Sequence, residues 1–282
     1  MSRFLAEPIT EKESASYTAG SLSIGRSTMQ GWRDSMEVHL CVFDVDVVQI
    51  PMDASTPDTY CVAVFDGHGG SAISQAVAKR MIPFIVETED FQSDRKSSES
   101  LAVALSKSFI GVDEALKVDP EFGTTSDEVG STGLFAIITP TDIICGNVGD
   151  SRCILSNAKS QEMIQLSVDH KPDLDFGDFW FKRNAALKPH QQLVTAEPCV
   201  RIHRRDASDE FMILCCDGIF DVMSNDQLRK FIRSKLKSGI RVPKDICEQL
   251  LDECLSKGSR DNMSAVLVLF ASGATGSASH KK

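Results

Sequence analysis

The chain has 282 residues, of which 42% are hydrophobic and 25% are charged. This is the composition of a globular protein that is long enough to bury a core without disulfides. Its net charge of −10 argues against a nucleic-acid partner, and its longest apolar runs, such as residues 265–271, are too short to span a bilayer.

Nine cysteines are present without a C-x-x-C pair, and most lie inside apolar runs. Buried, reduced thiols are the simplest interpretation. The odd count, together with the lack of a recognisable signal peptide, predicts a reducing compartment and a cytoplasmic protein. Location in the nucleus in addition to the cytoplasm is equally compatible with the sequence.

Strand-length runs rich in β-branched and apolar residues recur along the chain, and most end in Gly, Asp or Asn. They span residues 38–43, 60–65, 134–139, 143–148, 153–156, 211–216 and 265–270. The apolar stretches 143–148 and 151–156 flank Gly149-Asp150, and this pattern predicts a β-hairpin.

Helical periodicity occurs in consecutive pairs of segments. Apolar stripes predict helices over residues 71–86 and 99–118. Ser224 and Gln227 form a capping-box pattern that opens a third helix, and Pro243 suits the first turn of a fourth. Paired helices and hairpin-linked strands predict an α+β fold of antiparallel sheets covered by helices, in contrast to a doubly wound parallel sheet.

Four turns that contain aspartate lie at or near the ends of apolar runs: Asp66-Gly67, Gly149-Asp150, Asp217-Gly218 and Asp261-Asn262. A single turn of this kind is usually structural. Several carboxylates that meet at one point would instead form an oxygen-rich site, which suits Mg²⁺ or Mn²⁺.

The turns belong to a longer series of motifs in a fixed order. The series is Gln30-Gly-Trp-Arg-Asp-Ser-Met-Glu37, Asp66-Gly-His-Gly-Gly70, Gly130-Ser-Thr132, Gly149-Asp-Ser-Arg152, Asp169-His-Lys-Pro172, Cys216-Asp-Gly-Ile-Phe-Asp-Val-Met223 and Ser259-Arg-Asp-Asn-Met263. In composition and order it resembles the motifs of the metal-dependent protein phosphatases of type 2C. The resemblance runs from about residue 23 to residue 270.

This resemblance implies a four-layer α-β-β-α sandwich, in which two antiparallel sheets are flanked by helix pairs. It also implies two Mg²⁺ or Mn²⁺ ions in the cleft between the sheets. By motif position, Asp66 would bridge both ions, and the Gly67 carbonyl would bind one of them. Asp217 and Asp261 would hold the other ion.

The resemblance implies further roles around these ligands. Glu37 would act through metal-bound water, and Asp150 and Asp221 match positions that help to hold a weaker third ion. Arg33 offers a planar fork for two phosphate oxygens, and His68 is the candidate general acid for the departing serine or threonine oxygen. The implied activity is hydrolysis of phosphoserine and phosphothreonine in proteins by a hydroxide that bridges two ions roughly 4 Å apart.

Two features depart from the family pattern. After Asp169-His-Lys-Pro172 the family continues through a long stretch, whereas here Asp173-Leu-Asp-Phe176 leads directly into Gly177-Asp-Phe179. We therefore expect a fold that lacks some sheet strands and the flap beside the cleft, with an unpaired sheet edge. Val38 stands where the family usually has a second acidic residue, and this predicts weaker metal binding. Both features support the alternative of a protein that binds a phosphoprotein or partner with little or no turnover.

The expected organisation is an N-terminal extension over residues 1–22, a phosphatase-like domain over 23–270 and a disordered tail over 271–282. We expect a monomer that acts on a phosphoprotein and binds neither nucleic acid nor a membrane. The basic residues at 201–205 are expected in a solvated loop, with contact to a phosphopeptide as the alternative.

Overall fold

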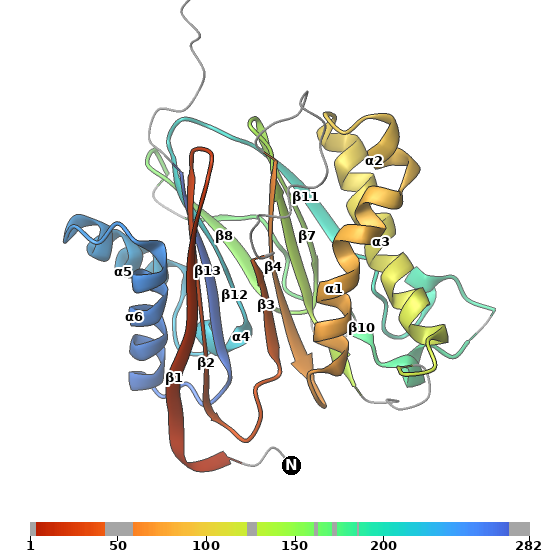
Figure 1. The fold of residues 1–282 in the computed structure, drawn as a ribbon, viewed down its shortest axis with the longest axis horizontal. Coiled ribbons are helices and arrows are strands. Elements are labelled where there is room, and N and C mark those ends of the chain that lie inside the picture. Colours follow the sequence, from red (N-terminus) through yellow and green to blue (C-terminus); the bar gives the residue numbers. More distant parts are fainter. Residues whose placement is uncertain are drawn as a thin grey trace, which may run out of the picture.

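The computed structural model describes residues 4–42, 59–122, 129–160, 163–170, 174–184 and 186–270. Two antiparallel β-sheets lie face to face, and helices cover both outer faces, so the molecule has four layers (Figure 1). The α+β sandwich predicted from the sequence is confirmed.

The first sheet has six strands in the order β1-β2-β13-β12-β8-β9. Their bounds are β1 Phe4–Ala19, β2 Leu22–Arg33, β13 Met263–Phe270, β12 Asp209–Cys215, β8 Arg152–Asn157 and β9 Ile164–Gln165. Every neighbouring pair is antiparallel. Because β2 pairs with β13, residues from near both ends of the chain meet in this sheet.

The N-terminal segment is part of the first sheet. Residues 4–19, which we expected in an extension, form β1 and pair with β2. The expected boundary at residue 22 therefore falls within a hairpin and separates no structural units. The sequence did not reveal this strand because most of its positions are exposed or half-buried and it has no continuous apolar run. The expected disordered tail, residues 271–282, lies outside the described residues.

The second sheet has the order β10-β5-β4-β6-β7-β11, and β3 also pairs with β4. The bounds are β10 Phe176–Gly177, β5 Gly130–Ser131, β4 Tyr60–His68, β6 Gly133–Ile138, β7 Asp142–Val148, β11 Cys199–Arg204 and β3 Val38–Val42. Strand β11 contains most of the basic stretch that we expected as a loop. That prediction is wrong, because residues 199–204 pair with β7.

The turn at Gly149-Asp150 connects the two sheets. We predicted a hairpin, but β7 pairs with β6 and β11 in the second sheet, whereas β8 pairs with β12 and β9 in the first. The prediction is wrong because β7 and β8 are both almost fully buried, and an unbroken apolar run does not indicate which sheet a strand joins. This crossing brings Asp150 to the edge between the sheets.

Helices form the two outer layers (Figure 1). Their bounds are α1 Ala72–Glu87, α2 Glu89–Ser93 and α3 Ser98–Val118 against the second sheet, α5 Asn225–Lys237 and α6 Pro243–Ser256 on the side of the first, and the short α4 Asp217–Phe220, η1 Phe179–Lys182 and η2 Pro189–Gln191. The four predicted helices are confirmed. Among the helices of the described residues, we find none with the length and hydropathy needed to cross a membrane.

The predicted start signals explain where the last two long helices begin. Ser224 Oγ accepts a hydrogen bond from the Gln227 backbone N–H at 3.3 Å, and the Ser224 backbone N–H donates to Gln227 Oε1 at 2.8 Å. This reciprocal pair is the capping box expected for α5. Pro243 occupies the first turn of α6, where the missing N–H costs no hydrogen bond.

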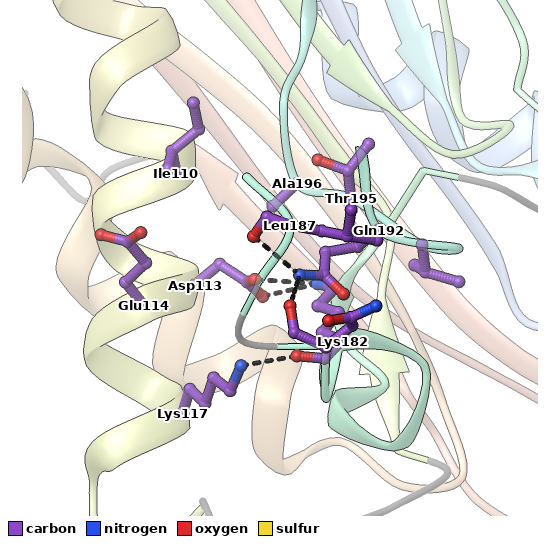
Figure 2. Close-up of a pocket in the computed structure, with 11 residues that line it drawn as sticks. Ile110, Asp113, Glu114, Lys117, Lys182, Leu187, Gln192, Thr195 and Ala196 are labelled. Carbon is purple, nitrogen blue, oxygen red and sulfur yellow. Dashed lines mark hydrogen bonds and ion pairs between the residues drawn. The ribbon is translucent and has the colours of Figure 1, made fainter. Parts of the chain in front are cut away.

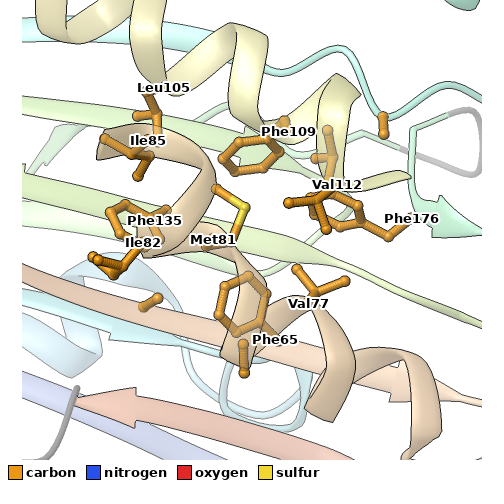
Figure 3. Packing of buried hydrophobic residues seen from close by; sticks show 14 of the residues in the cluster. Phe65, Val77, Met81, Ile82, Ile85, Leu105, Phe109, Val112, Phe135 and Phe176 are labelled. Atoms are coloured by element: carbon orange, nitrogen blue, oxygen red, sulfur yellow. The ribbon is translucent and has the colours of Figure 1, made fainter. Parts of the chain in front are cut away.

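The central strands of the second sheet are buried on both faces. On one face, Phe65 and Phe135 pack with Met81 of α1 and Phe109 of α3 (Figure 3). On the other face, neighbouring residues such as Val64 pack against the first sheet. Burial on both faces explains why β4 and β6 are continuous apolar runs in the sequence. It also fixes the end of β4, which carries the acidic turn after Phe65.

Each sheet has a two-residue strand at one edge, β9 in the first sheet and β10 in the second. In the first sheet, only Ile154 and Leu155 of the six residues in β8 have partners in β9. The segment after β10 exposes large apolar side chains, with Trp180 52% and Leu193 76% exposed. The edge continues beyond β9, because the Cys153 carbonyl accepts from the Leu166 N–H at 2.9 Å and the Cys153 N–H donates to Ser167 Oγ at 2.9 Å. The unpaired sheet edge that we expected from the missing stretch is therefore not found at β8 in the described chain.

Gly25 of β2 makes the close approach of α6 to the first sheet possible. A Cβ at this position would lie 2.1 Å from the Lys244 backbone nitrogen and 2.4 Å from the Pro243 carbonyl carbon. Since these are backbone atoms, the helix would have to move. We expect Gly25→Ala to lower the free energy of unfolding by about 3 kcal/mol, the upper end for overpacked cores, as measured by urea denaturation.

Gly111→Ala is the control for this prediction. Its Cβ would meet only the ring of Phe84, at 3.0 Å, and alanine favours a helix by up to about 1 kcal/mol over glycine. An equal loss of stability in both variants would show that the contact with α6 is not the cause.

Candidate metal centre

A cleft of ≈ 290 Å³ lies where strand ends of the two sheets meet. Its lining residues are Arg33, Asp66, Gly67, His68, Thr132, Gly149, Asp150, His170, Asp175, Asp217 and Asp261. Seven of these were predicted as site residues: Arg33, Asp66, Gly67, His68, Asp150, Asp217 and Asp261. The fold thus brings together side chains that are up to 228 positions apart in the sequence.

Four aspartates form a dense acidic group at this cleft. Carboxylate oxygens of Asp217, Asp221 and Asp261 lie within 4.8 Å of one another, and so do carboxylate oxygens of Asp66 and Asp217. Burial, followed by repulsion from Asp217 and Asp261, raises the pKa of Asp66 well above its ordinary value. Burial, followed by repulsion from Asp261, raises the pKa of Asp217 to about 7. Asp221 belongs to this group although it does not line the cleft.

This donor set fits hard divalent cations. Carboxylate and carbonyl oxygens are the ligands that Mg²⁺ and Mn²⁺ prefer, and a dication would relieve the repulsion among the aspartates. The backbone approaches closely at Gly67, where a Cβ would lie 2.7 Å from the Glu37 carbonyl oxygen. Repulsion from Asp150 also contributes to the raised pKa values of Asp66 and Asp217. The Asp150 carboxylate therefore belongs to the same acidic surroundings.

Glu37 lies beside the cleft and not in its lining. Its carboxylate accepts a hydrogen bond from Ser35 Oγ at 2.8 Å, and its backbone N–H donates to Asn262 Oδ1 at 2.9 Å. The Asn262 side chain also donates to the carbonyl oxygens of Gln30 and Ser35. Asn262 therefore fixes the segment between β2 and β3, a role that its place in a motif did not reveal.

Arg33 faces the acidic group from the end of β2. Its Nε and Nη2 atoms donate to Asp261 Oδ1 and Oδ2 at 2.8 and 2.7 Å. This bidentate pair fixes the plane of the guanidinium at the cleft. Because Asp261 occupies the edge formed by Nε and Nη2, the edge formed by Nη1 and Nη2 is the one that could match two oxygens of a phosphate group. The phosphate-binding role of Arg33 stays a prediction.

His68 ends β4 and lines the cleft. Its Nε2 atom lies 3.1 Å from Asp178 Oδ2, and the hydrogen bond to Asp178 raises the pKa of His68. Gly130 makes room for the ring, because a Cβ there would lie 2.6 Å from His68 Nε2. A raised pKa favours the protonated imidazole, which is the form that a general acid requires.

Asp178 is a site residue that the sequence analysis missed. It is the one non-glycine residue with a positive φ, 47°, in the described part of the chain. Such a conformation costs ~1–3 kcal/mol and persists where the surroundings hold it. Asp178 lies in the Gly177-Asp178-Phe179 segment that the resemblance includes, but glycine next to aspartate is also a common turn. The sequence therefore contained this motif, but it did not indicate that Asp178 contacts His68.

Asp175 and His170 also line the cleft and were not predicted. Asp175 Oδ1 is buried and has no hydrogen-bond partner among the described residues, and burial raises the pKa of Asp175 to about 7. Ligand atoms of His68, Asp175 and Asp178 lie within 4.8 Å of one another. Asp175 falls in the junction that departs from the family pattern, so no motif indicated it.

A comparison with family models decides the assignment. The model described as "Protein phosphatase 2C" matches residues 22–175 and 175–263. The chain belongs to the protein phosphatase 2C family. The two matched stretches meet at Asp175, inside the short junction, as expected for a member of this family that lacks an internal segment.

A relative in the same family is longer than this chain over the aligned region. Protein phosphatase ppm-1.A of Caenorhabditis elegans is 33% identical over 314 aligned positions, which include 96% of this chain and 64% of that protein. Since the present chain has 282 residues, the alignment contains positions of the relative that are missing here. The chain thus spans less than two thirds of that phosphatase.

Solved structures show the protein phosphatase 2C fold. Serine-threonine phosphatase 2C from Toxoplasma gondii superposes with a TM-score of 0.75 at 20% identity, covering 92% of this chain and 99% of that one. The catalytic domain of the serine threonine protein phosphatase PstP, in complex with two manganese ions, gives 0.57 at 18% identity, covering 88% and 97%. The chain therefore has the fold of these phosphatases.

Proposed function

We propose that this chain hydrolyses phosphoserine and phosphothreonine in proteins with the help of two Mg²⁺ or Mn²⁺ ions. The observation that carries the proposal is the convergence of Asp66, Asp217 and Asp261 on one cleft, with pKa values of Asp66 and Asp217 raised by burial and mutual repulsion. When bound, a pair of divalent ions neutralises phosphate charge and makes water acidic enough to attack at neutral pH.

The proposed ligands are those that the family resemblance implies, and the clustering of the aspartates at the cleft supports them. Asp66 and the carbonyl of Gly67 would hold one ion, and Asp66, Asp217 and Asp261 the other. Asp150 and Asp221 would support a third, weaker ion. PstP, which shares the fold, binds two manganese ions, and this supports the assignment.

Three residues would act on the phosphate and on the leaving group. Arg33, held in plane by Asp261, would orient two phosphate oxygens. His68 would donate a proton from Nδ1, the ring nitrogen that does not contact Asp178, to the departing serine or threonine oxygen. Asp178 would hold the imidazole ring in position from 3.1 Å away.

A second candidate function is binding of a phosphoprotein without turnover. The short junction at Asp175 favours it, and so does Val38. The Val38 side chain is 3% exposed and packs in the core between the sheets, directly opposite Asp66 in the register of β3 and β4. It therefore offers no oxygen to the cleft, which would weaken metal binding.

Turnover separates the two candidates. We expect the chain to hydrolyse p-nitrophenyl phosphate when Mn²⁺ is added, and Asp66→Ala and Asp217→Ala to lose this activity. A chain that is no faster than these variants in Mn²⁺ would contradict the catalytic proposal and leave the binding function. Cytoplasmic location and a monomeric state are further proposals, and size-exclusion chromatography with light scattering tests the latter.

The proton-donor role of His68 gives a separate prediction. We expect His68→Gln to slow hydrolysis of a phosphoserine peptide by about 10²-fold, a typical contribution of general acid catalysis. Hydrolysis of p-nitrophenyl phosphate should fall far less, because p-nitrophenolate leaves without a proton. Steady-state kinetics on both substrates measure the difference. Equal losses on both would contradict a role in protonating the leaving group.

A further inference from the structure

A second pocket, of ≈ 140 Å³, lies between α3 and residues 182–196 (Figure 2). It contains an ion pair that is almost fully buried, with Asp113 8% and Lys182 4% exposed. Lys182 Nζ donates to both carboxylate oxygens of Asp113 at 2.8 Å and to the carbonyl oxygen of Asp175 at 2.7 Å. All three protons of the ammonium group are therefore used.

This ion pair ties the residues just before Asp178 to Lys182, which follows it. Asp113 Oδ1 accepts a hydrogen bond from the Gly177 backbone N–H at 2.8 Å, while Lys182 binds the carbonyl of Asp175. The Asp178 backbone N–H donates to the Val129 carbonyl at 3.1 Å. These contacts fix the chain around Asp178 and support its left-handed φ of 47°.

The strand register connects this segment to the cleft. Gly177 of β10 pairs with Gly130 of β5, and Gly130 pairs with His68 of β4. Asp178 follows Gly177 and reaches His68 Nε2 at 3.1 Å. This distance is already close to the limit for a good hydrogen bond, so a displacement of Gly177 by about 1 Å would break the contact.

We propose that Asp113 and Lys182 are positioning residues for proton transfer by His68. They fix the segment that carries Asp178, and Asp178 fixes the imidazole ring. The inference rests on the proposed function, in which His68 protonates the leaving oxygen. Neither Asp113 nor Lys182 lines the cleft, so both act through Asp178. An ion pair that served stability alone would affect all substrates equally.

Two substrates with different leaving groups test this inference at saturating Mn²⁺. Lys182→Met removes the ammonium group and keeps a side chain of similar length. We expect kcat for a phosphoserine peptide to fall about tenfold or more, within the range of general acid catalysis. For p-nitrophenyl phosphate we expect kcat to change less than about threefold, and KM to stay constant for both substrates. Asp178→Asn should show the same preference.

Arg80→Met is the matched control. The Arg80 side chain pairs with Asp119 at 2.5 Å and joins α1 to the end of α3, and neither residue takes part in the ion pair of Asp113 and Lys182. Its loss should change kcat by the same factor for both substrates. If Lys182→Met does not fold, the double variant Asp113→Leu with Lys182→Met removes the unpaired buried charge and takes its place.

The outcomes separate this inference from the proposed function. If His68→Gln slows the peptide selectively, but a folded Lys182→Met or double variant slows both substrates equally or neither, the positioning role is wrong and the function stands. If His68→Gln itself shows no selectivity, the proton-donor role fails and the inference fails with it. Selective loss in His68→Gln, Asp178→Asn and Lys182→Met together supports the whole chain of contacts.

Discussion

Asp66→Asn is expected to lower kcat for a phosphoserine peptide at least about 10³-fold at saturating Mn²⁺. Asp66 lies in the acidic group with Asp217 and Asp261, and in the proposed site it is the ligand shared by both ions. Without the two ions, the transition state of phosphate hydrolysis loses several kcal/mol of stabilisation. Each 1.36 kcal/mol corresponds to a tenfold change in rate. Steady-state kinetics with a coupled phosphate assay measure the effect.

Asp226→Asn is the control for this substitution. Asp226 is an exposed carboxylate of α5 that pairs with Arg229 and Lys230 and does not line the cleft. We expect its kcat to stay within about twofold of the unmodified chain, since exposed ion pairs contribute little. Retention of more than about one tenth of the activity in Asp66→Asn would show that Asp66 does not hold the catalytic ions.

Mn²⁺ is expected to raise the thermal unfolding midpoint by roughly 10 °C. A ligand that binds only the folded state stabilises it by about 4 kcal/mol at a thousandfold excess over its dissociation constant. For a chain of this size each kcal/mol shifts the midpoint by about 2–4 °C. Differential scanning calorimetry with and without Mn²⁺ measures the shift.

The raised pKa values set the direction of the pH dependence. Because the folded-state pKa of Asp217 is raised from 3.8 to about 7, the metal-free protein binds more protons folded than unfolded. Its stability therefore falls as the pH rises from about 4 to about 7. Protons and Mn²⁺ compete for the same oxygens, so the Mn²⁺-induced shift should be larger at pH 8 than at pH 5.

Asp217→Asn tests the cause of both effects. Removal of this carboxylate should raise the midpoint of the metal-free protein at pH 8, since it relieves repulsion within the acidic group. The same variant should lose most of the Mn²⁺-induced shift. A variant that is less stable without metal and still gains roughly 10 °C from Mn²⁺ would contradict a metal site at Asp217.

The core of the fold was readable from the sequence where burial is continuous. Strands such as β4 and β6 are buried on both faces, so their apolar runs are unbroken, and the capping box at Ser224 locates the start of α5. Strand β1 and strand β11 were not readable, because both lie at sheet edges and alternate exposed with half-buried positions. Edge strands need fewer apolar residues and leave a weaker pattern.

The hairpin predicted at Gly149-Asp150 shows a second limit. Strand pairing is a long-range property, and β8 joins β12 through residues more than 50 positions away. The turn residues are equally suited to a hairpin and to a crossing between sheets. This error concerned the topology alone. Asp150 was still identified as a site residue, because the prediction used the motif around it and did not depend on which strand pairs with β7 or β8.

The candidate site was predictable where a motif supplies a charged group, as at Asp66, Asp217 and Asp261. The residues that orient those groups were not, because their roles depend on three-dimensional contacts. Asp178 reaches His68 only through the pairing of β10, β5 and β4. Asn262 acts through a side chain that binds backbone groups of residues 30–37. No spacing in the sequence encodes either contact.

Direct measurement of metal stoichiometry tests the central claim, that carboxylates from distant parts of the chain hold a pair of divalent ions. Isothermal titration calorimetry of the metal-free chain with Mn²⁺ is expected to show at least two ions bound per chain. In Asp217→Asn this uptake should be weakened or lost, while Asp226→Asn should match the unmodified chain. Uptake of no Mn²⁺, or uptake that is the same in Asp217→Asn, would contradict the account.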